Sequence, residues 1–378
     1  MKTLSRVSVA PNGLQLEDEA GLSHTLSSYW LRDNCHCAAC RHPGNGQKLY
    51  AISELPTDLQ AAQAEVAADG GLSVTWSDRH SSSYALSWLH QHGLDQEGRA
   101  LRRPTHQLWN RDIATALPEG DWPTMLEDPA AELAWLERYS ALGFGLLRRV
   151  PCDSGMVAEV GNRLGHVRVT NYGRLFDVKS APNPNNLADT SLGLGVHSDN
   201  PYRNPSPGIQ LLHCLECEAP GGETLLVDGF AAARLLRQED GAAFDLLCRL
   251  PMNFRYANAD TELQARQTLI STDGEGQVCG VHFNNRSADW LDAPAEQVGA
   301  WYQAYIAFAR ILQRPELELI FRLGPGDLVV MQNDRTLHGR TAFDPNLGRR
   351  HLQGCYIDRD GVESRRMVLR RSVGAWSQ

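Results

Sequence analysis

Two histidines and one aspartate in this chain have the types and the spacing of a metal centre. His197 and Asp199 are separated by one residue, and His338 lies far downstream in Leu337-His338-Gly339-Arg340. Residues two apart on a strand point to the same face, so His197 and Asp199 can reach one metal ion. Two imidazoles and one carboxylate, with open positions beside them, are the ligands that non-haem Fe(II) oxygenases use. An isolated His-X-Asp triplet is usually a solvated loop, but together with His338 it predicts an Fe(II) centre.

An arginine follows at a useful distance. Arg350 lies twelve residues after His338 and begins the strand-like run Arg350-His351-Leu352-Gln353-Gly354. A guanidinium there can hold the distal carboxylate of 2-oxoglutarate through two parallel hydrogen bonds. Arg349 is adjacent, and alternation along a strand would point one of the two inward and the other to solvent. The residues alone leave open which arginine faces the metal.

A second metal site is predicted near the N-terminus. Cys35, Cys37 and Cys40 lie within six residues, and three thiolates need one more ligand to close a tetrahedral zinc site. The candidates for that ligand are His80, His36 and His42. A closed site of this kind would be structural and would stabilise a module too small to build a strong core. The alternative is three reduced, inert cysteines. Cys214 and Cys217 are expected to be ordinary buried thiols.

Composition bounds the class of protein. The chain has 378 residues, 42% of them hydrophobic and 21% charged, with a formal net charge of −9. An acidic balance argues against a nucleic-acid partner, and no apolar run is long enough for a membrane span. The first residues lack the apolar core of a signal peptide, and nine cysteines form an odd set. We therefore expect a cytoplasmic protein with reduced thiols.

The pattern along the chain predicts three parts. Residues 1–95 hold short alternating runs, including Thr25–Leu31, that are typical of a small β module. Residues 96–128 are predicted to be a linker, and residues 129–378 a larger domain. Within that domain the spacing predicts helices at 129–142 and 294–312, and strands at 208–215, 326–331 and 351–357.

Several segments together resemble the γ-butyrobetaine hydroxylase family, which belongs to the taurine-dioxygenase-like, 2-oxoglutarate-dependent oxygenases. The segments are His197–Arg203, Gln210–Cys214, Gly221–Thr224, Val227–Phe230, Phe283–Asn285 and Leu337–Arg340. The likeness covers essentially the whole chain. It implies a mainly β fold with flanking helices, in which a distorted double-stranded β-helix (jelly roll) forms the catalytic domain and a small zinc-binding β module precedes it.

The resemblance also implies roles for individual residues. His197, Asp199 and His338 would bind Fe(II), while Arg350, with Thr224, would bind 2-oxoglutarate. His80 would complete the zinc site with Cys35, Cys37 and Cys40. The implied reaction uses O2 to hydroxylate an unactivated C–H bond, and ascorbate can assist as a reductant. Asp199 argues against a halogenase of this fold, which needs Gly or Ala there. A homodimer is a further expectation from the family.

The family binds a trimethylammonium group in an aromatic cage, because such a cation is attracted to aromatic faces and has no hydrogen bond to donate. Tyr172 and Tyr356 match cage positions, and Phe176 stands where Trp is usual. Asp189 stands where the animal enzymes have Tyr. A carboxylate at this position can replace a π-face by Coulomb attraction.

The anionic end of the substrate is predicted from other positions. Asn186 and Asn284 match family residues that hold a carboxylate, and Asn200 replaces a Tyr of the animal enzymes. Tyr202 and Arg203 follow closely. A roomier site rich in hydrogen-bond donors would suit a phosphonate. The favoured substrate is therefore 2-(trimethylammonio)ethylphosphonate, as in related bacterial enzymes, with γ-butyrobetaine as the alternative. No site for the α-amino acid head of trimethyllysine is identified.

Overall fold

The computed structural model describes residues 3–11, 13–103, 105–179 and 191–374. The chain divides into two compact units, residues 1–104 and 105–378. Residues 96–128, which the sequence suggests as a linker, carry regular structure on both sides of this boundary. No helix of the described residues is long and apolar enough to cross a membrane.

The first unit contains two small antiparallel sheets. One is formed by β1 (Leu4–Ala10), β2 (Gly13–Asp18) and β3 (Ser23–Ser27), and the other by β4 (Ala61–Val66), β5 (Leu72–Trp76) and β6 (Ser81–Tyr84). The helices of this unit are α1 (Ser28–Asp33), η1 (Ile52–Glu54), α2 (Leu86–His92) and α3 (Gln96–Leu101). Alternate residues of both sheets, such as Leu14 and Leu16, or Leu72 and Val74, are buried in one shared core.

The prediction of a strand over Thr25–Leu31 is wrong in its second half. β3 ends at Ser27, and α1 begins at Ser28. Leu31 lies in this helix and its side chain is buried. Its carbonyl accepts a hydrogen bond from the Tyr84 hydroxyl. The alternating pattern of a strand therefore applies only up to Ser27. A single buried leucine does not distinguish a short helix from a strand in the sequence.

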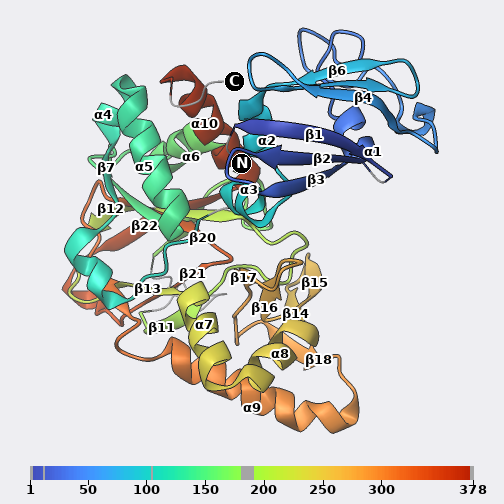
Figure 1. Cartoon of the computed structure of the whole chain (residues 1–378). Coiled ribbons are helices and arrows are strands. Elements are labelled where there is room, and N and C mark those ends of the chain that lie inside the picture. Colours follow the sequence, from blue (N-terminus) through green and yellow to red (C-terminus); the bar gives the residue numbers. More distant parts are fainter. Residues whose placement is uncertain (1–2, 12, 104, 180–190, 375–378) are drawn as a thin grey trace. The chain divides into compact units, whose positions relative to one another are not determined.

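The second unit is built on two facing sheets (Figure 1). The larger has seven strands, in the order β10 (Phe176–Val178), β22 (Arg350–Ile357), β12 (Ile209–Cys217), β20 (Leu328–Gln332), β8 (Phe144–Arg148) and β7 (Glu119–Asp121), with β9 (Val167–Arg168) also paired to β22. The smaller has the order β11 (Leu194–His197), β21 (Thr336–Arg340), β13 (Thr224–Asp228) and β19 (Leu319–Phe321). Side chains of both sheets, among them Phe144, Leu226, Val329 and Leu352, form one core between them. This arrangement is the predicted jelly roll.

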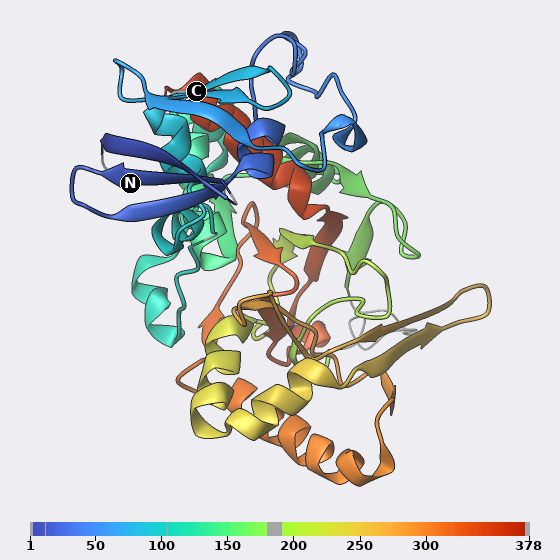
Figure 2. The same cartoon turned by 45° about the vertical axis from the view of Figure 1, so that its right-hand side comes forward.

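Helices cover the two sides of this unit. On one side are α4 (Trp122–Glu127), α5 (Pro129–Leu142), α6 (Met156–Leu164) and α10 (Arg359–Ser372). Of these, α5 and α6 pack on the larger sheet, and α10 packs against α5 and α6. On the other side are α7 (Gly229–Glu239), α8 (Gly241–Arg249) and α9 (Ala295–Leu312). The remaining elements are η2 (Arg111–Ala116), η4 (Pro345–Leu347), β14 (Met252–Ala257), β15 (Glu262–Gln267), β16 (Ile270–Thr272), β17 (Val278–Val281) and β18 (Ala288–Leu291). Figure 2 shows β14 and β15 extending outward as a hairpin.

Candidate active site

His197, Asp199 and His338 meet at one end of the smaller sheet. His197 is the last residue of β11, and it lies opposite His338 of β21 in the strand register. The two imidazole centroids are 4.4 Å apart. Asp199 Oδ1 lies 3.3 Å from His197 Nε2, and Asp199 Oδ2 lies 3.8 Å from His338 Nε2. One ligand atom from each side chain can therefore face a common point, and we call these residues the His–Asp–His cluster.

Neighbouring groups hold the cluster in this orientation. His197 Nδ1 lies 2.9 Å from the carbonyl oxygen of Gly195, which directs Nε2 toward Asp199. The backbone of Asp199 is fixed from both sides by the Asn333 amide, which accepts from Asp199 N at 2.7 Å and donates to Asp199 O at 2.9 Å. Gln210 Nε2 and the Tyr356 hydroxyl both donate to Asp199 Oδ2.

The electrostatics favour a divalent metal. Burial alone would raise the pKa of the Asp199 carboxyl, but His338, His197 and the Tyr356 hydroxyl hold it below its usual range. Burial, together with the nearby His197, lowers the pKa of His338 to about 3. An ionised Asp199 carboxylate beside a neutral His338 imidazole is the protonation state in which these two groups bind a metal. The donor set fits Fe(II).

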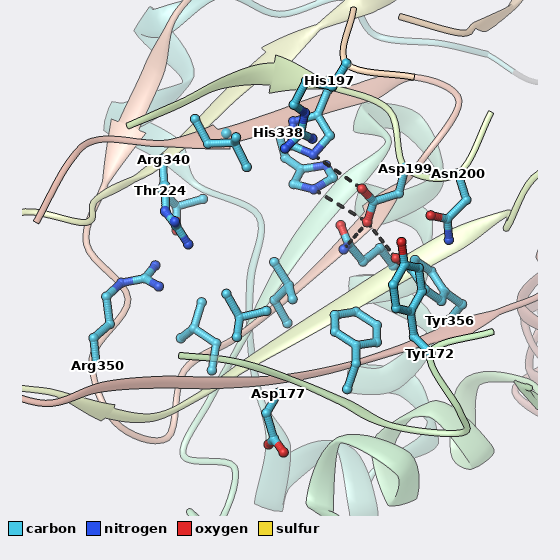
Figure 3. A pocket seen from close by; sticks show the side chains of 18 residues that line it. Tyr172, Asp177, His197, Asp199, Asn200, Thr224, His338, Arg340, Arg350 and Tyr356 are labelled. Atoms are coloured by element: carbon cyan, nitrogen blue, oxygen red, sulfur yellow. Dashed lines mark hydrogen bonds and ion pairs between the residues drawn. The ribbon is translucent and has the colours of Figure 1, made fainter. Parts of the chain in front are cut away.

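A pocket of about 180 Å³ opens beside the cluster. Figure 3 shows the cluster between two groups of side chains, with Arg340, Arg350 and Thr224 on one side and Asn200, Tyr172 and Tyr356 on the other. The remaining lining residues are Phe176, Asp177, Val178, Leu194, Gln210, Leu212, Arg286, Gly339 and Leu352. The pocket thus has two differently composed ends.

One end of the pocket suits a carboxylate. Arg350 is buried, donates to the carbonyl of Gly222 at 3.1 Å, and leaves its Nε without a partner among the described residues. Gly222 has a φ of +67°, and a Cβ there would lie 2.6 Å from Arg350 Nε, so this position requires glycine. Arg349 is 79% exposed and faces Glu216. Alternation therefore turns Arg350 inward, and its free donor fits the distal carboxylate of 2-oxoglutarate.

The other end is aromatic. The ring centroid of Phe176 is 5.1 Å from that of Tyr356 and 6.4 Å from that of Tyr172. The three rings line the same pocket. Burial raises the pKa of the Tyr356 hydroxyl, and the Asp199 carboxylate that accepts its hydrogen bond raises it further. Tyr356 therefore stays neutral and keeps its proton on the bond to Asp199.

Asn200 lies between the cluster and the aromatic end. Its backbone is in the left-handed region, with a φ of 51°, which is tolerated by Asn and is often found at functional sites. Its Oδ1 accepts from the Tyr202 hydroxyl at 2.7 Å. Its Nδ2 is buried and has no partner among the described residues. A buried amide donor that faces a pocket is a place for an acceptor on a ligand.

Other predicted residues lie near the pocket but do not line it. Tyr202 supports Tyr172 through a hydroxyl contact of 3.0 Å, and Arg203 binds the side chain of Asn171. Asn284 donates to the carbonyl of Ser198 and accepts from the backbone of Arg286. These contacts indicate that the three residues support residues of the site and do not themselves line the pocket. Asn186 and Asp189 lie outside the described residues.

Arg286, Gln210 and Arg340 line the pocket, but the sequence analysis assigned no role to them. Arg286 follows Asn284 by two residues and enters the pocket. The residue is exposed, but desolvation by its neighbours lowers its pKa, while the nearby Asp199, Tyr172 and Tyr202 act in the opposite direction. In the described part of the chain, no carboxylate lies within ion-pair distance of it. Gln210 and Arg340 were quoted in motifs without a role. The sequence did offer one signal for Arg286, because it directly follows the family motif Phe283–Asn285.

The predicted zinc ligands come together in the first unit. His80 Nε2 lies 3.3 Å from Cys35 Sγ, 3.6 Å from Cys37 Sγ and 3.5 Å from Cys40 Sγ. His36 and His42, the competing candidates, are exposed and outside this group. Arg32 donates to Cys40 Sγ and pairs with Asp78, whose carboxylate also fixes the backbone of His80. Three sulfurs and one nitrogen without an open side fit a structural zinc.

Comparisons with known proteins agree with this geometry. The model of the taurine catabolism dioxygenase TauD, TfdA family matches residues 102–356, and that of the γ-butyrobetaine hydroxylase-like N-terminal region matches residues 5–90. The γ-butyrobetaine dioxygenase of Pseudomonas sp. (strain AK-1) is 36% identical over 367 residues, covering 95% of this chain and 94% of that protein. The human γ-butyrobetaine dioxygenase is 30% identical, covering 91% of each chain. The trimethyllysine dioxygenase of Meyerozyma guilliermondii is 29% identical, covering 95% and 94%. This chain therefore belongs to the TauD, TfdA family and is a 2-oxoglutarate-dependent non-haem iron dioxygenase of its γ-butyrobetaine hydroxylase-like branch.

Proposed function

We propose that this enzyme hydroxylates 2-(trimethylammonio)ethylphosphonate. The observation that carries the proposal is a pair of donors that line the pocket. The Arg286 guanidinium has no ion-pair partner among the described residues, and the buried Asn200 Nδ2 amide has no hydrogen-bond partner there. A guanidinium that lines a pocket without a carboxylate partner can pair with an anionic group on a ligand. A phosphonate has three acceptor oxygens and up to two negative charges, so it can satisfy both donors at once.

The aromatic end supports a quaternary ammonium group at the other end of the substrate. Tyr172, Phe176 and Tyr356 line the pocket, and a trimethylammonium cation is attracted to the face of an aromatic ring by about 0.5–2 kcal/mol. A cation and an anion separated by two carbons would then lie across the space beside the His–Asp–His cluster.

Other residues of the pocket would bind the metal and the co-substrate. His197, Asp199 and His338 would hold Fe(II), which when bound couples the oxidative decarboxylation of 2-oxoglutarate by O2 to hydroxylation of the substrate. Arg350 would anchor the distal carboxylate of 2-oxoglutarate, with Thr224 at the same end of the pocket. Arg286, Asn200 and the aromatic rings would orient one substrate C–H bond toward the metal and exclude water from it.

γ-Butyrobetaine is the second candidate, because the relatives named for that substrate include the Pseudomonas enzyme at 36% identity. Its carboxylate can also pair with an arginine, but it has two acceptor oxygens and one charge. Trimethyllysine is disfavoured by Arg286. Its α-carboxylate could pair with the Arg286 guanidinium, but its α-ammonium group would then lie close to the same guanidinium, and two like charges repel each other.

A direct comparison of substrates tests the proposal. The two compounds are incubated side by side with enzyme, Fe(II), 2-oxoglutarate, ascorbate and O2, and products are followed by mass spectrometry. We expect a gain of one oxygen on the phosphonate with a much higher kcat/KM than on γ-butyrobetaine. Preferential oxidation of γ-butyrobetaine would overturn the phosphonate assignment and place the enzyme in carnitine formation.

A further inference from the structure

Gln210 and Tyr356 are direct partners across two neighbouring strands. Gln210 of β12 lies opposite Tyr356 of β22 in the antiparallel register. Side chains of directly opposed residues project from the same face of a sheet. Here both reach the same atom, Asp199 Oδ2, with donor–acceptor distances of 2.5 Å from Gln210 Nε2 and 2.7 Å from the Tyr356 hydroxyl. All three side chains line the pocket, and Figure 3 shows both contacts as dashed lines.

Two donors use the hydrogen-bonding capacity of one carboxylate oxygen. Each oxygen of an ionised carboxylate offers two lone pairs, and a metal bond through Oδ2 would have to displace one of these donors. Asp199 Oδ1 is bound by neither of these two donors and faces His197 Nε2 at 3.3 Å. The two oxygens of Asp199 are thereby made different, one held by the sheet and the other left for a metal.

We infer that Gln210 and Tyr356 form a two-donor clamp that makes Asp199 a ligand through Oδ1 alone. A carboxylate that binds through one oxygen occupies one metal position and leaves three for 2-oxoglutarate and O2, whereas a chelating carboxylate would take a position needed by one of them. Gln210 is in this view a positioning residue. Tyr356 has two roles, because its ring lines the substrate end while its hydroxyl orients the metal ligand.

The orientation of the Gln210 amide supports this assignment. Its Oε1 is buried and has no partner among the described residues. An unpaired buried acceptor lowers the free energy of unfolding. Turning the amide over would place Oε1 against the Asp199 carboxylate and lose the bond from Nε2. The amide therefore keeps its donor on Asp199, and Oε1 remains available to a proton donor on a ligand or water in the pocket.

The inference rests on the proposed iron site, so its test separates the two. Gln210→Leu removes the amide donor, and Tyr356→Phe removes the hydroxyl but keeps the ring. Gln332→Leu is the matched control, because Gln332 is another buried glutamine on the neighbouring strand β20 and, within the described residues, makes no hydrogen bond to Asp199. Asp199→Ala tests the metal site itself. Each variant is first compared with the parent by thermal unfolding.

The primary measurement is the affinity for Co(II) or Mn(II), by calorimetry, in the presence of 2-oxoglutarate. Outer partners of this kind are worth about 10- to 100-fold in metal affinity, so we expect each of Gln210→Leu and Tyr356→Phe to weaken binding by such a factor. The Co(II) absorption spectrum should change as well, and more succinate should be formed per hydroxylated product. Gln332→Leu should resemble the parent in all three measurements.

Parent-like metal affinity and Co(II) spectra in both Gln210→Leu and Tyr356→Phe would overturn the clamp. If Asp199→Ala also bound metal normally, the iron assignment would fail with it. If only Asp199→Ala lost the metal, the iron site would stand and the clamp alone would be rejected. Tyr356→Phe keeps the test open if Gln210→Leu does not fold, since only one hydroxyl is removed.

Discussion

Arg335 and Asp228 form an ion pair in which both side chains are completely buried. Arg335 Nε lies 3.2 Å from Asp228 Oδ1, and the guanidinium also donates to the carbonyls of Ala141 and Gln107. Asp228 ends β13 and caps α7 through the backbone of Phe230. Arg335 directly precedes β21, the strand that carries His338. The pair therefore fixes the start of β21 against β13, and its role is to position the metal ligand.

Replacing one partner of this pair should be costly. Arg335→Met leaves the Asp228 carboxylate buried without its cation, and such a change typically costs about 3–5 kcal/mol of unfolding free energy. Urea unfolding of the second unit is the measurement. Arg314→Met is the control, because Arg314 pairs with Glu239 at the surface and should change stability little. Equal losses in the two variants would contradict the role assigned to Arg335.

The zinc site predicts a stability that depends on metal and pH. Cys40→Ser should lose the zinc that the parent retains, and its first unit should unfold at lower temperature, because the small core there relies on the metal. Metal analysis and calorimetric unfolding measure both effects. Cys152→Ser is the control, since Cys152 is exposed and lies in the second unit.

Acid should weaken zinc binding. Burial and the neighbouring Cys35 raise the pKa of the Cys40 thiol to about 11, so this group carries a proton at neutral pH when no metal is bound. Zinc must displace that proton, and its affinity therefore falls as the pH falls. Chelators should strip the metal faster at pH 6 than at pH 8. A pH-independent zinc affinity would argue that the thiols are not the ligands.

Arg350 and Arg349 offer a matched pair for the 2-oxoglutarate site. Arg350→Met removes a buried guanidinium from the pocket, and loss of one partner of a buried charge pair costs about 2–5 kcal/mol. The KM for 2-oxoglutarate should therefore rise by at least about 30-fold, as measured by succinate formation. Arg349→Met should leave this KM unchanged, because Arg349 faces solvent. A larger effect at Arg349 would reverse the assignment.

Much of this site could be predicted from sequence, because short motifs keep their ligands together. His197 and Asp199 are two residues apart, the zinc cysteines lie within six residues, and Arg350 follows His338 at a short interval. Gln210 and Arg286 could not be assigned in this way. The contact of Gln210 with Asp199 depends on the register between β12 and β22, and only folding sets that register. Arg286 lines the pocket, and the Asn284 side chain accepts a hydrogen bond from its backbone N–H, a contact that the sequence does not reveal.

The choice of substrate depends most directly on Arg286. Arg286→Met removes the cation that we assign to the phosphonate, and a hydrogen bond to a charged group contributes about 1.5–3 kcal/mol. kcat/KM for the phosphonate should fall by roughly 10- to 150-fold, mostly through KM, while the KM for 2-oxoglutarate stays unchanged. Arg203→Met is the informative comparison, because Arg203 lies close in sequence to Asn200 but binds Asn171 outside the pocket. A greater loss in Arg203→Met than in Arg286→Met would mean that the anion is bound by Arg203, which the sequence suggested, and that the Arg286 guanidinium does not contact it.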